Sequence, residues 1–245
     1  MNLNLNNKKA LVMGGSTGIG KAIALSLVNE GVEVYICSRS ELKLKACCDE
    51  IGAAGYEVCD LSVPLASKQL IDKLIKRIGQ IDILVTNTGG PEKGSFLEVS
   101  DQQWQQDFQS LWMSPVESIK TILPIMKSNN YGRIILVTSV AAKEPIAGLT
   151  TSNGLRAGLP GLARSIANEF SAFGITINCL LPGYTSTQRL KSLNLSDQTI
   201  KAMIPAGRLA EPSELADLAT FLASEKGAYI TGQSIAIDGG LLNGH

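Results

Sequence analysis

The stretch that decides the fold is Met13-Gly14-Gly15-Ser16-Thr17-Gly18-Ile19-Gly20. It stands between an apolar run of strand length, Lys9–Met13, and a helix-length segment, Ile19–Glu30. Glycines are needed where the backbone must turn sharply and approach a pyrophosphate, and the following helix N-terminus offers free N–H groups and partial positive charge. The position of this cluster therefore indicates a nucleotide-binding strand–turn–helix unit; the alternative is a tight turn without a ligand.

Apolar runs of strand length alternate with helix-length segments along the whole chain. The runs are rich in Val and Ile and do not alternate polar with apolar residues, which is typical of parallel strands covered on both faces. The predicted strands are Lys9–Met13, Glu33–Cys37, Tyr56–Asp60, Asp82–Val85, Arg133–Thr138, Ile175–Leu181 and Gln233–Asp238. The predicted helices are Ile19–Glu30, Glu41–Ile51, Leu65–Ile78, Asp101–Ser128, Asn153–Phe173 and Pro212–Ser224. This alternation predicts an α/β fold, a single Rossmann domain over residues 1–245 with a doubly wound parallel sheet of about seven strands.

Two local patterns bear on these helices. Gly158, Pro160 and Gly161 fall inside the fifth long helix, where an interior proline costs about 3 kcal/mol. Either the helix is kinked there or it begins later. Ser100 followed by Gln103 indicates a capping box at the start of the fourth helix.

Composition excludes several classes of protein. The 22 Lys and Arg cancel the 22 Asp and Glu, which argues against a nucleic-acid binder or an electrostatic membrane binder. No apolar run approaches the roughly 18 residues of a membrane span, and no signal peptide is visible.

The five cysteines are odd in number and have no CxxC spacing, so we expect reduced thiols in a cytoplasmic protein. The one histidine, His245, is terminal, which argues against a metal site or a histidine-based triad.

The second predicted strand bears on the choice of cofactor. An acidic residue at its end would accept a hydrogen bond from the ribose 2′-hydroxyl of NAD. This chain has Cys37-Ser38-Arg39-Ser40 there, with no acid before Glu41. A guanidinium can bind a 2′-phosphate with two hydrogen bonds, so Arg39 favours NADP(H). The alternative is an ordinary solvated arginine.

The spacing Gly14-x3-Gly18-x-Gly20 resembles that of the short-chain dehydrogenase/reductase family, and in particular its 3-oxoacyl-(acyl carrier protein) reductases. Landmarks after the later strands agree with the family pattern: Asp60-Leu61, Asn87-Thr88-Gly89-Gly90, Ser139, Pro182-Gly183 with Thr185 and Thr187, Thr231-Gly232, and Ile237-Asp238-Gly239-Gly240. The resemblance implies the Rossmann fold, an NADP(H) cofactor and a homotetramer. It assigns the cofactor to Gly14, Ser16, Thr17, Gly18, Ile19, Ser38, Arg39, Asp60, Leu61, Asn87, Gly89, Arg156, Pro182, Gly183, Thr185 and Thr187.

The catalytic residues depart from the family pattern at three of four positions. Ser139 matches the family serine. Thirteen residues on, where the family has tyrosine, stands Ser152, and four further on Arg156 replaces the lysine. Leu111, seven residues after Trp104, replaces the family asparagine.

The altered site retains part of the chemistry of carbonyl reduction. A serine hydroxyl is far less acidic than a phenol, whose pKa is about 10, so Ser152 does not simply replace the tyrosine as the acid. Arg156 keeps the positive charge and could stabilise a developing alkoxide by a few kcal/mol, but it does not give up its proton. Water or Tyr184 is then the candidate acid. The structural alternatives are a backbone cap for Ser139, a helix N-terminal residue for Ser152, a solvated helix face for Arg156 and a cofactor-packing aromatic for Tyr184.

Three functions remain open from the sequence. The first is an NADP(H)-dependent oxidoreductase with a rebuilt site, acting on a carbonyl or hydroxyl compound such as an acyl thioester. The second is a nucleotide-binding sensor or regulatory subunit without turnover, and the third is a lyase or isomerase. In each, residues 184–206 would form a substrate lid, with Arg189, Lys191 and Lys201 as basic side chains for an anionic substrate or, alternatively, as a solvated surface.

Replacing Arg39 tests the cofactor assignment. Arg39→Ala should weaken NADPH binding by about 1.5–3 kcal/mol, the value of a charge-assisted contact, and leave NADH binding nearly unchanged. Calorimetric titration of both cofactors measures this difference. Equal losses for the two cofactors would refute a contact between Arg39 and the 2′-phosphate.

Overall fold

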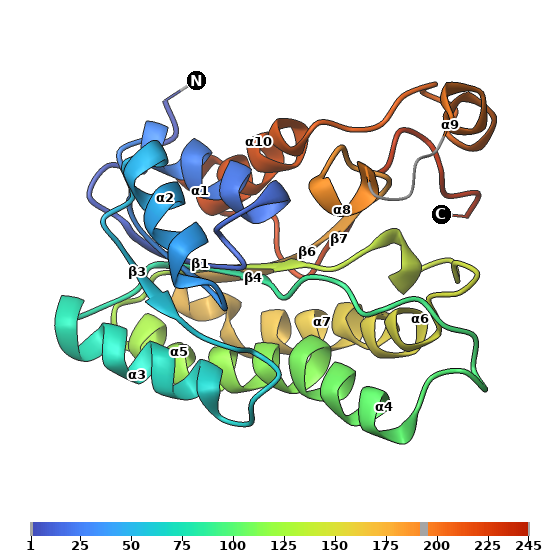
Figure 1. Ribbon diagram of the computed structural model, residues 1–245. Coiled ribbons are helices and arrows are strands. Elements are labelled where there is room, and N and C mark those ends of the chain that lie inside the picture. Colours follow the sequence, from blue (N-terminus) through green and yellow to red (C-terminus); the bar gives the residue numbers. More distant parts are fainter. Residues whose placement is uncertain (1, 192–195, 245) are drawn as a thin grey trace.

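Seven parallel strands form one sheet in the order β3-β2-β1-β4-β5-β6-β7 (Figure 1). The computed structural model describes residues 2–191 and 196–244, without the side chains of Arg189 and Lys191. Part of the predicted lid and His245 therefore lie outside the described residues. The strands are β1 Lys9–Met13, β2 Glu33–Ser38, β3 Gly55–Val58, β4 Ile83–Asn87, β5 Gly132–Val137, β6 Ile175–Pro182 and β7 Ser234–Ile237.

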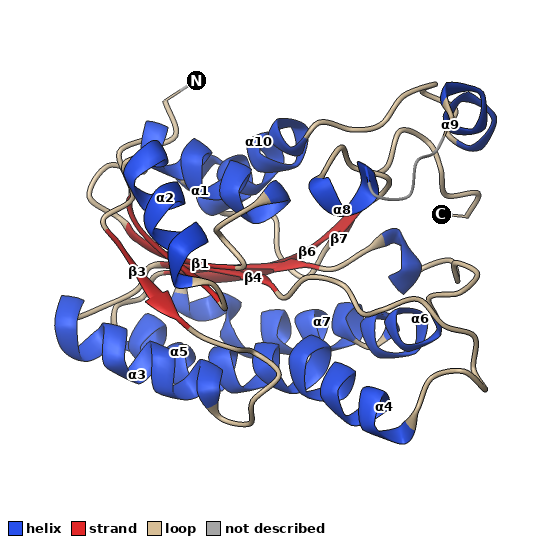
Figure 2. Ribbon diagram, viewed as in Figure 1, coloured by secondary structure: helices blue, strands red, loops and turns tan. Residues whose placement is uncertain are grey.

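Helices cover both faces of the sheet (Figure 2). One face packs against α1 (Gly18–Asn29), α2 (Glu41–Ile51) and α10 (Pro212–Ala223). The other packs against α3 (Ala66–Ile78), α5 (Ser114–Ser128) and α7 (Leu159–Phe170). The remaining helical elements are α4 Asp101–Phe108, α6 Thr150–Ala157, α8 Gln188–Lys191, α9 Asp197–Met203, the π-helix Gln109–Met113 and the 3-10 turns Val140–Ala142, Ser171–Phe173 and Glu225–Gly227. The predicted α/β fold with a doubly wound parallel sheet is confirmed.

The order of the strands reverses between β1 and β4. Val12 of β1 pairs with Ile36 of β2 on one side and with Val85 of β4 on the other. Chain connections leave β1 and β4 towards opposite edges of the sheet, so a crevice opens at their carboxyl ends. That crevice is where a doubly wound sheet binds its ligand, and it lies directly beside the glycine loop.

The segment Asp101–Ser128 is helical throughout, as predicted, but it is not one regular α-helix. A π-helix at Gln109–Met113 separates α4 from α5, and Leu111, the residue in place of the family asparagine, lies inside it with 2% of its surface exposed. A π turn adds a residue to the helical register, a feature that sequence periodicity does not reveal. Ser100 caps α4 by accepting from the Gln103 N–H, but the Gln103 side chain donates to Asp107, so the capping box is only half formed.

The fifth predicted helix begins earlier than expected and is divided. It starts at Thr150, ends at Ala157 as α6 and resumes at Leu159 as α7. Pro160 then lies in the first turn of α7, where its missing N–H costs no hydrogen bond. A Cβ atom on Gly158 would lie 2.7 Å from the ring of Trp112, so close packing explains the glycine.

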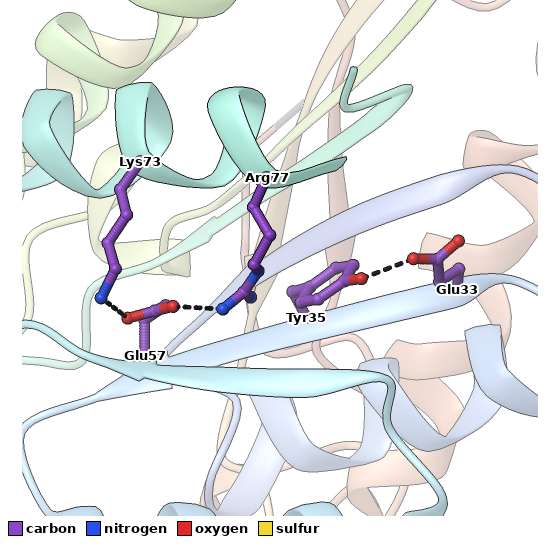
Figure 3. Close-up of polar contacts among 5 residues, drawn as sticks. All are labelled: Glu33, Tyr35, Glu57, Lys73 and Arg77. Carbon is purple, nitrogen blue, oxygen red and sulfur yellow. Dashed lines mark hydrogen bonds and ion pairs between the residues drawn. The ribbon is translucent and has the colours of Figure 1, made fainter. Parts of the chain in front are cut away.

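An ion cluster holds the edge strand β3 against α3 (Figure 3). Glu57 accepts from Lys73 at 2.6 Å and from Arg77 at 2.7 Å. The Arg77 guanidinium lies 5.1 Å from the ring centre of Tyr35, whose hydroxyl donates to Glu33. Burial and the neighbouring Glu33 carboxylate raise the pKa of Tyr35 to about 12. Charged side chains on a short edge strand also discourage pairing with another chain.

Hydrophobic helices of membrane-spanning length are not found within residues 2–191 and 196–244.

Two glycines at the α6–α7 junction should respond to alanine in opposite ways. Gly158→Ala forces a methyl group against Trp112 and should lower the free energy of unfolding by about 1–3 kcal/mol. Gly161→Ala is the matched control: Gly161 lies in α7, and among the described residues no atom beyond its chain neighbours and its own helix backbone comes within 4 Å of its Cβ position, so it should stabilise by about 0.4–1 kcal/mol. Chemical denaturation measures both. A Gly158→Ala variant as stable as the Gly161→Ala variant would contradict the packing argument.

Candidate active site

The glycine loop and Asn87 meet at the crevice between β1 and β4. Gly14 has a φ of +60°, and a Cβ atom there would lie 2.3 Å from the Asn87 carbonyl oxygen. A Cβ atom on Gly20 would lie 2.2 Å from the Gly14 carbonyl oxygen. The Asn87 side-chain amide donates to that same Gly14 oxygen at 3.3 Å. The loop after β1 therefore lies so close to the end of β4 that only glycine fits, and this contact holds the loop rigidly at the crevice.

The segment after β6 closes over the start of α1. Within the described residues, the Thr17 side chain does not cap the helix, so the N–H groups of its first turn remain available to a ligand phosphate. The Cγ2 atom of Thr187 lies 3.2 Å from the Cβ position of Gly18. The structure thus brings together two predicted cofactor residues that are far apart in the sequence. Ser16 and Ile19 belong to the same loop and first helical turn.

Four predicted adenosine-end residues lie at or after the carboxyl ends of β2 and β3: Ser38, Arg39, Asp60 and Leu61. The Ser38 hydroxyl is buried and has no hydrogen-bond partner among the described residues. Arg39 is exposed beside it. Partial burial opposes ionisation of Asp60, but two hydrogen bonds from Ser62 and the nearby Arg39 charge hold the pKa of its carboxyl below the usual value. Leu61 packs against the core. An unsatisfied hydroxyl beside an exposed guanidinium fits a phosphorylated ribose.

Ser139 follows β5 and caps the 3-10 turn after it. Its Oγ accepts from the Ala141 N–H at 3.1 Å, as the structural alternative for this residue predicts. Because the hydroxyl acts as acceptor in that bond, its own proton is available to donate to a substrate oxygen. Capping and catalysis are therefore compatible at Ser139.

Ser152 and Arg156 lie on successive turns of α6 and are 3% and 5% exposed. Arg156 donates to the Val137 carbonyl at 3.2 Å and to the Gly89 carbonyl. Burial of Arg156 contradicts the alternative of a solvated helix face. Its guanidinium links the end of β5 to the turn after β4, where Gly89 has a φ of +79°. The positive charge is thus at the carboxyl end of the sheet, close to Ser139.

The turn after β6 is tightly packed against the C-terminal segment. A Cβ atom on Gly183 would lie 2.7 Å from the Asp238 Cα. The buried Thr185 donates through its hydroxyl to the Gly183 carbonyl at 3.2 Å. The Tyr184 carbonyl accepts from the Ala210 N–H at 3.0 Å, and its side chain is partly exposed. This turn, with Pro182 at the end of β6, therefore lies at the carboxyl end of the sheet against the C-terminal segment.

Sequence reasoning missed the residues that hold the loops around the site. The Asn153 side chain accepts from the Ile146 N–H at 3.0 Å and donates to the Ile146 carbonyl at 2.9 Å. The Gly94 N–H donates to the Gly148 carbonyl at 2.9 Å, and the Thr150 hydroxyl donates to the Gly94 carbonyl at 3.1 Å. Because their partners are backbone atoms, which every residue has, the sequence carries no signal for these contacts.

Comparison with known proteins identifies the family. A family model described as "Enoyl-(Acyl carrier protein) reductase" matches residues 14–242. The chain belongs to the short-chain dehydrogenase/reductase family. It is 33% identical over 241 residues to the 3-oxoacyl-[acyl-carrier-protein] reductase FabG of Escherichia coli, covering 98% of this chain and 99% of that one.

Solved structures of the short-chain dehydrogenase/reductase family have the same architecture. YwfH, an NADPH-dependent reductase involved in bacilysin biosynthesis, superposes with a TM-score of 0.93 at 31% identity, covering 98% of this chain and 100% of that one. The L-sorbose reductase of Gluconobacter frateurii, complexed with NADPH and L-sorbose, superposes with a TM-score of 0.93 at 26% identity over 100% of both chains.

Replacing Arg156 tests its place in the site. We expect Arg156→Ala to lower NADPH affinity by about tenfold or more, because a charge-assisted contact is lost. Arg156→Lys is the matched control, since it keeps the charge and should retain most of the affinity. Calorimetric titration measures binding, and thermal unfolding of each variant separates a local loss from global unfolding. Unchanged affinity in a folded Arg156→Ala variant would remove Arg156 from the cofactor site.

Proposed function

We propose that this protein is an NADP(H)-dependent oxidoreductase of the 3-oxoacyl reductase type, acting on a carbonyl or hydroxyl substrate through a non-standard active site. The observation that carries the proposal is the cluster of predicted cofactor residues around the glycine loop, here named the cradle, beside two polar groups, Ser139 and Arg156, at the carboxyl end of β5. Glycines that no other residue can replace, together with the unsatisfied Ser38 hydroxyl and Arg39, support a phosphorylated dinucleotide. The NADPH named in the descriptions of YwfH and L-sorbose reductase supports the same cofactor.

Residues of the chain would orient the substrate, stabilise developing charge and supply a proton. NADPH, when bound, would supply the hydride. Ser139 donates a hydrogen bond to the carbonyl oxygen and so orients it. The buried positive charge of Arg156 stabilises the negative charge that develops on that oxygen, an effect typically of a few kcal/mol. Ser152 stands where the family has a phenol, and its hydroxyl is too weak an acid to take over proton donation. The proton reaches the oxygen from water or from Tyr184.

A second function is favoured by one specific observation. The Arg156 guanidinium binds the Val137 and Gly89 carbonyls. Together with Ser152 and Leu111, this arrangement also suits a protein that binds NADP(H) without turning it over, as a redox sensor or regulatory subunit would. Such a protein needs the cradle but no proton donor.

We propose an acyl thioester as the substrate class, because the relatives named above include acyl-carrier-protein reductases.

We further propose a cytoplasmic homotetramer, in which the helical layers α4–α5 and α6–α7 form an interface between subunits. The exposed Phe108 on α4 supports this interface, since apolar surface favours association.

Turnover distinguishes the two functions. NADPH oxidation, followed by its absorbance, should occur with at least one member of a panel of 3-oxoacyl thioesters, aldehydes and quinones. Tight NADPH binding without oxidation of any of them would favour the sensor.

Restoring the family residues tests whether the site has been rebuilt. The double variant Ser152→Tyr with Arg156→Lys should still bind NADPH but gain less than about tenfold in rate with a 3-oxoacyl thioester, because a phenol enters a pocket packed for serine. A single Ser152→Tyr variant is the control for overpacking. A large gain of turnover in the double variant would indicate that the site had simply lost its catalytic residues.

A further inference from the structure

A cavity of about 520 Å³ opens at the amino ends of β1, β2 and β3, at the end of the sheet opposite the cofactor crevice. Its volume lies in the range of pockets that bind small molecules. The crevice is one strand length away, roughly 15–20 Å. The lining residues that bear on its chemistry are Lys9, Glu33, Tyr35, Ala54, Gly55 and Arg77.

The pairing of the strands brings four of these residues onto one face of the sheet. Lys9 of β1 pairs with Glu33 of β2, and Tyr35, two residues further along β2, pairs with Gly55 of β3. Paired residues of neighbouring strands, and residues two apart in one strand, point to the same side of a sheet. The end of α3, which carries Arg77, covers this face. The cavity is therefore built from three strands and one helix.

Opposite charges line this cavity without neutralising one another. Although Lys9 and Glu33 are paired in the sheet, no ion pair joins them within residues 2–191 and 196–244. Instead the Lys9 Nζ atom donates to the Ile78 carbonyl at 2.7 Å, and the Glu33 carboxylate accepts from the Tyr35 hydroxyl at 2.5 Å. An ammonium group has three donors and a carboxylate accepts about four hydrogen bonds, so both groups can also bind a ligand.

Arg77 adds a second positive charge. Its Nη1 atom donates to Glu57 at 2.7 Å, and its Nη2 atom lies 3.6 Å from the Cβ position of Gly55. The Tyr35 side chain, only 7% exposed, has the guanidinium 5.1 Å from its ring centre and Glu33 at its hydroxyl. Figure 3 shows the resulting row, in which Tyr35 lies between Arg77 and Glu33. A cation and an anion are therefore held apart by the length of a tyrosine side chain.

Small residues keep the cavity open at the start of β3. Ala54 and Gly55 line it there. A Cβ atom on Gly55 would lie 3.2 Å from two carbon atoms of the Tyr35 ring, which is closer than an ordinary contact. Gly55 is not among the glycines with a positive φ, so its backbone conformation does not require glycine. The missing side chain instead leaves room beside the ring and the guanidinium.

We propose that this cavity is a second binding site, for a small organic acid that also carries an amino group. The acidic group binds Lys9 and Arg77, and the ammonium group binds Glu33. Two cations against one carboxylate favour a ligand with an acidic group, and the carboxylate disfavours an acid that lacks the amino group. The site does not depend on the proposed function, because it shares no residue with the cradle, Ser139 or Arg156.

Matched probes test the ligand class with the full-length protein. β-Alanine carries a carboxylate and an ammonium group, and propionate is the same molecule without the ammonium group. In ligand-observed saturation-transfer NMR titrations, β-alanine should bind about tenfold more tightly than propionate, because a charge-assisted contact with Glu33 is added. Phosphoethanolamine has a phosphate in place of the carboxylate. Tighter binding than β-alanine assigns a phosphate ester to the site and weaker binding assigns an amino acid, and either order supports the site.

Variants determine whether the probes bind in the cavity. Glu33→Gln removes the charge but keeps an acceptor for the Tyr35 hydroxyl, so β-alanine should lose about tenfold in affinity and propionate should lose none. Lys9→Met should weaken both probes. Lys45→Met is its matched control, since Lys45 is exposed on α2 and does not line the cavity, and it should weaken neither. Ala54→Leu places an apolar side chain in the cavity, leaves every charge in place and should abolish binding of both. Thermal unfolding checks that each variant is folded.

Several results would overturn the proposal. Equal affinities for β-alanine and propionate would remove Glu33 from the site. Binding unchanged by Ala54→Leu would place the probes elsewhere, as would their displacement by NADPH, whose crevice lies at the other end of the strands. Binding of none of the probes at up to about 10 mM would refute the site. A protein that binds β-alanine in this cavity but oxidises no NADPH with any substrate refutes the proposed function and leaves the second site established.

Discussion

Asn87, at the carboxyl end of β4, lies so close to the loop after β1 that no side chain fits on Gly14 or Gly20. This approach occurs where the order of the strands reverses, and it sets the position of the first turn of α1 relative to the rest of the sheet. Thr187 packs onto Gly18 of that same turn. The crevice is lined by β1, β4 and the segment after β6. The relative positions of these three parts therefore depend on one rigid backbone contact.

The electrostatics of the site depend on one positive charge, because the family's lysine and tyrosine are replaced and Arg156 is charged. The positive charge of a lysine lowers the pKa of a neighbouring phenol. This chain has neither residue at the family's catalytic positions, where it has Arg156 and Ser152. Arg156 keeps a permanent charge and uses its planar donors on the Val137 and Gly89 carbonyls, so it also joins the loops after two neighbouring strands. In the proposed mechanism, charge stabilisation and loop architecture therefore depend on one side chain. The hydrogen bonds between Asn153 and Ile146 and between Thr150 and Gly94 add to the same framework of loops.

The sheet was largely predictable because each strand is encoded by its own apolar run. The strand predicted at Tyr56–Asp60 lies at Gly55–Val58, and the other boundaries move by similarly few residues. The two long helices were less predictable. Their breaks depend on packing between helices: the π turn around Leu111 and the contact of Trp112 with Gly158 join segments that are far apart in the sequence. Local propensity indicated a disruption near Pro160 and left two alternatives, a kink or a later start; the chain is helical on both sides of Gly158.

The sequence by itself determined the succession of strands and helices along the chain, the place of the glycine loop and which residues stand where the family has its catalytic groups, because these depend on local composition and spacing. Only the tertiary structure decided that Arg156 is buried against two backbone carbonyls, that Ser139 caps a turn while keeping its proton available, and that Asn153 binds the backbone of Ile146. The physical reason is the same in each case. The partner of each side chain is a backbone N–H or carbonyl group, which every residue carries, so the choice among partners is made by distance in the folded chain.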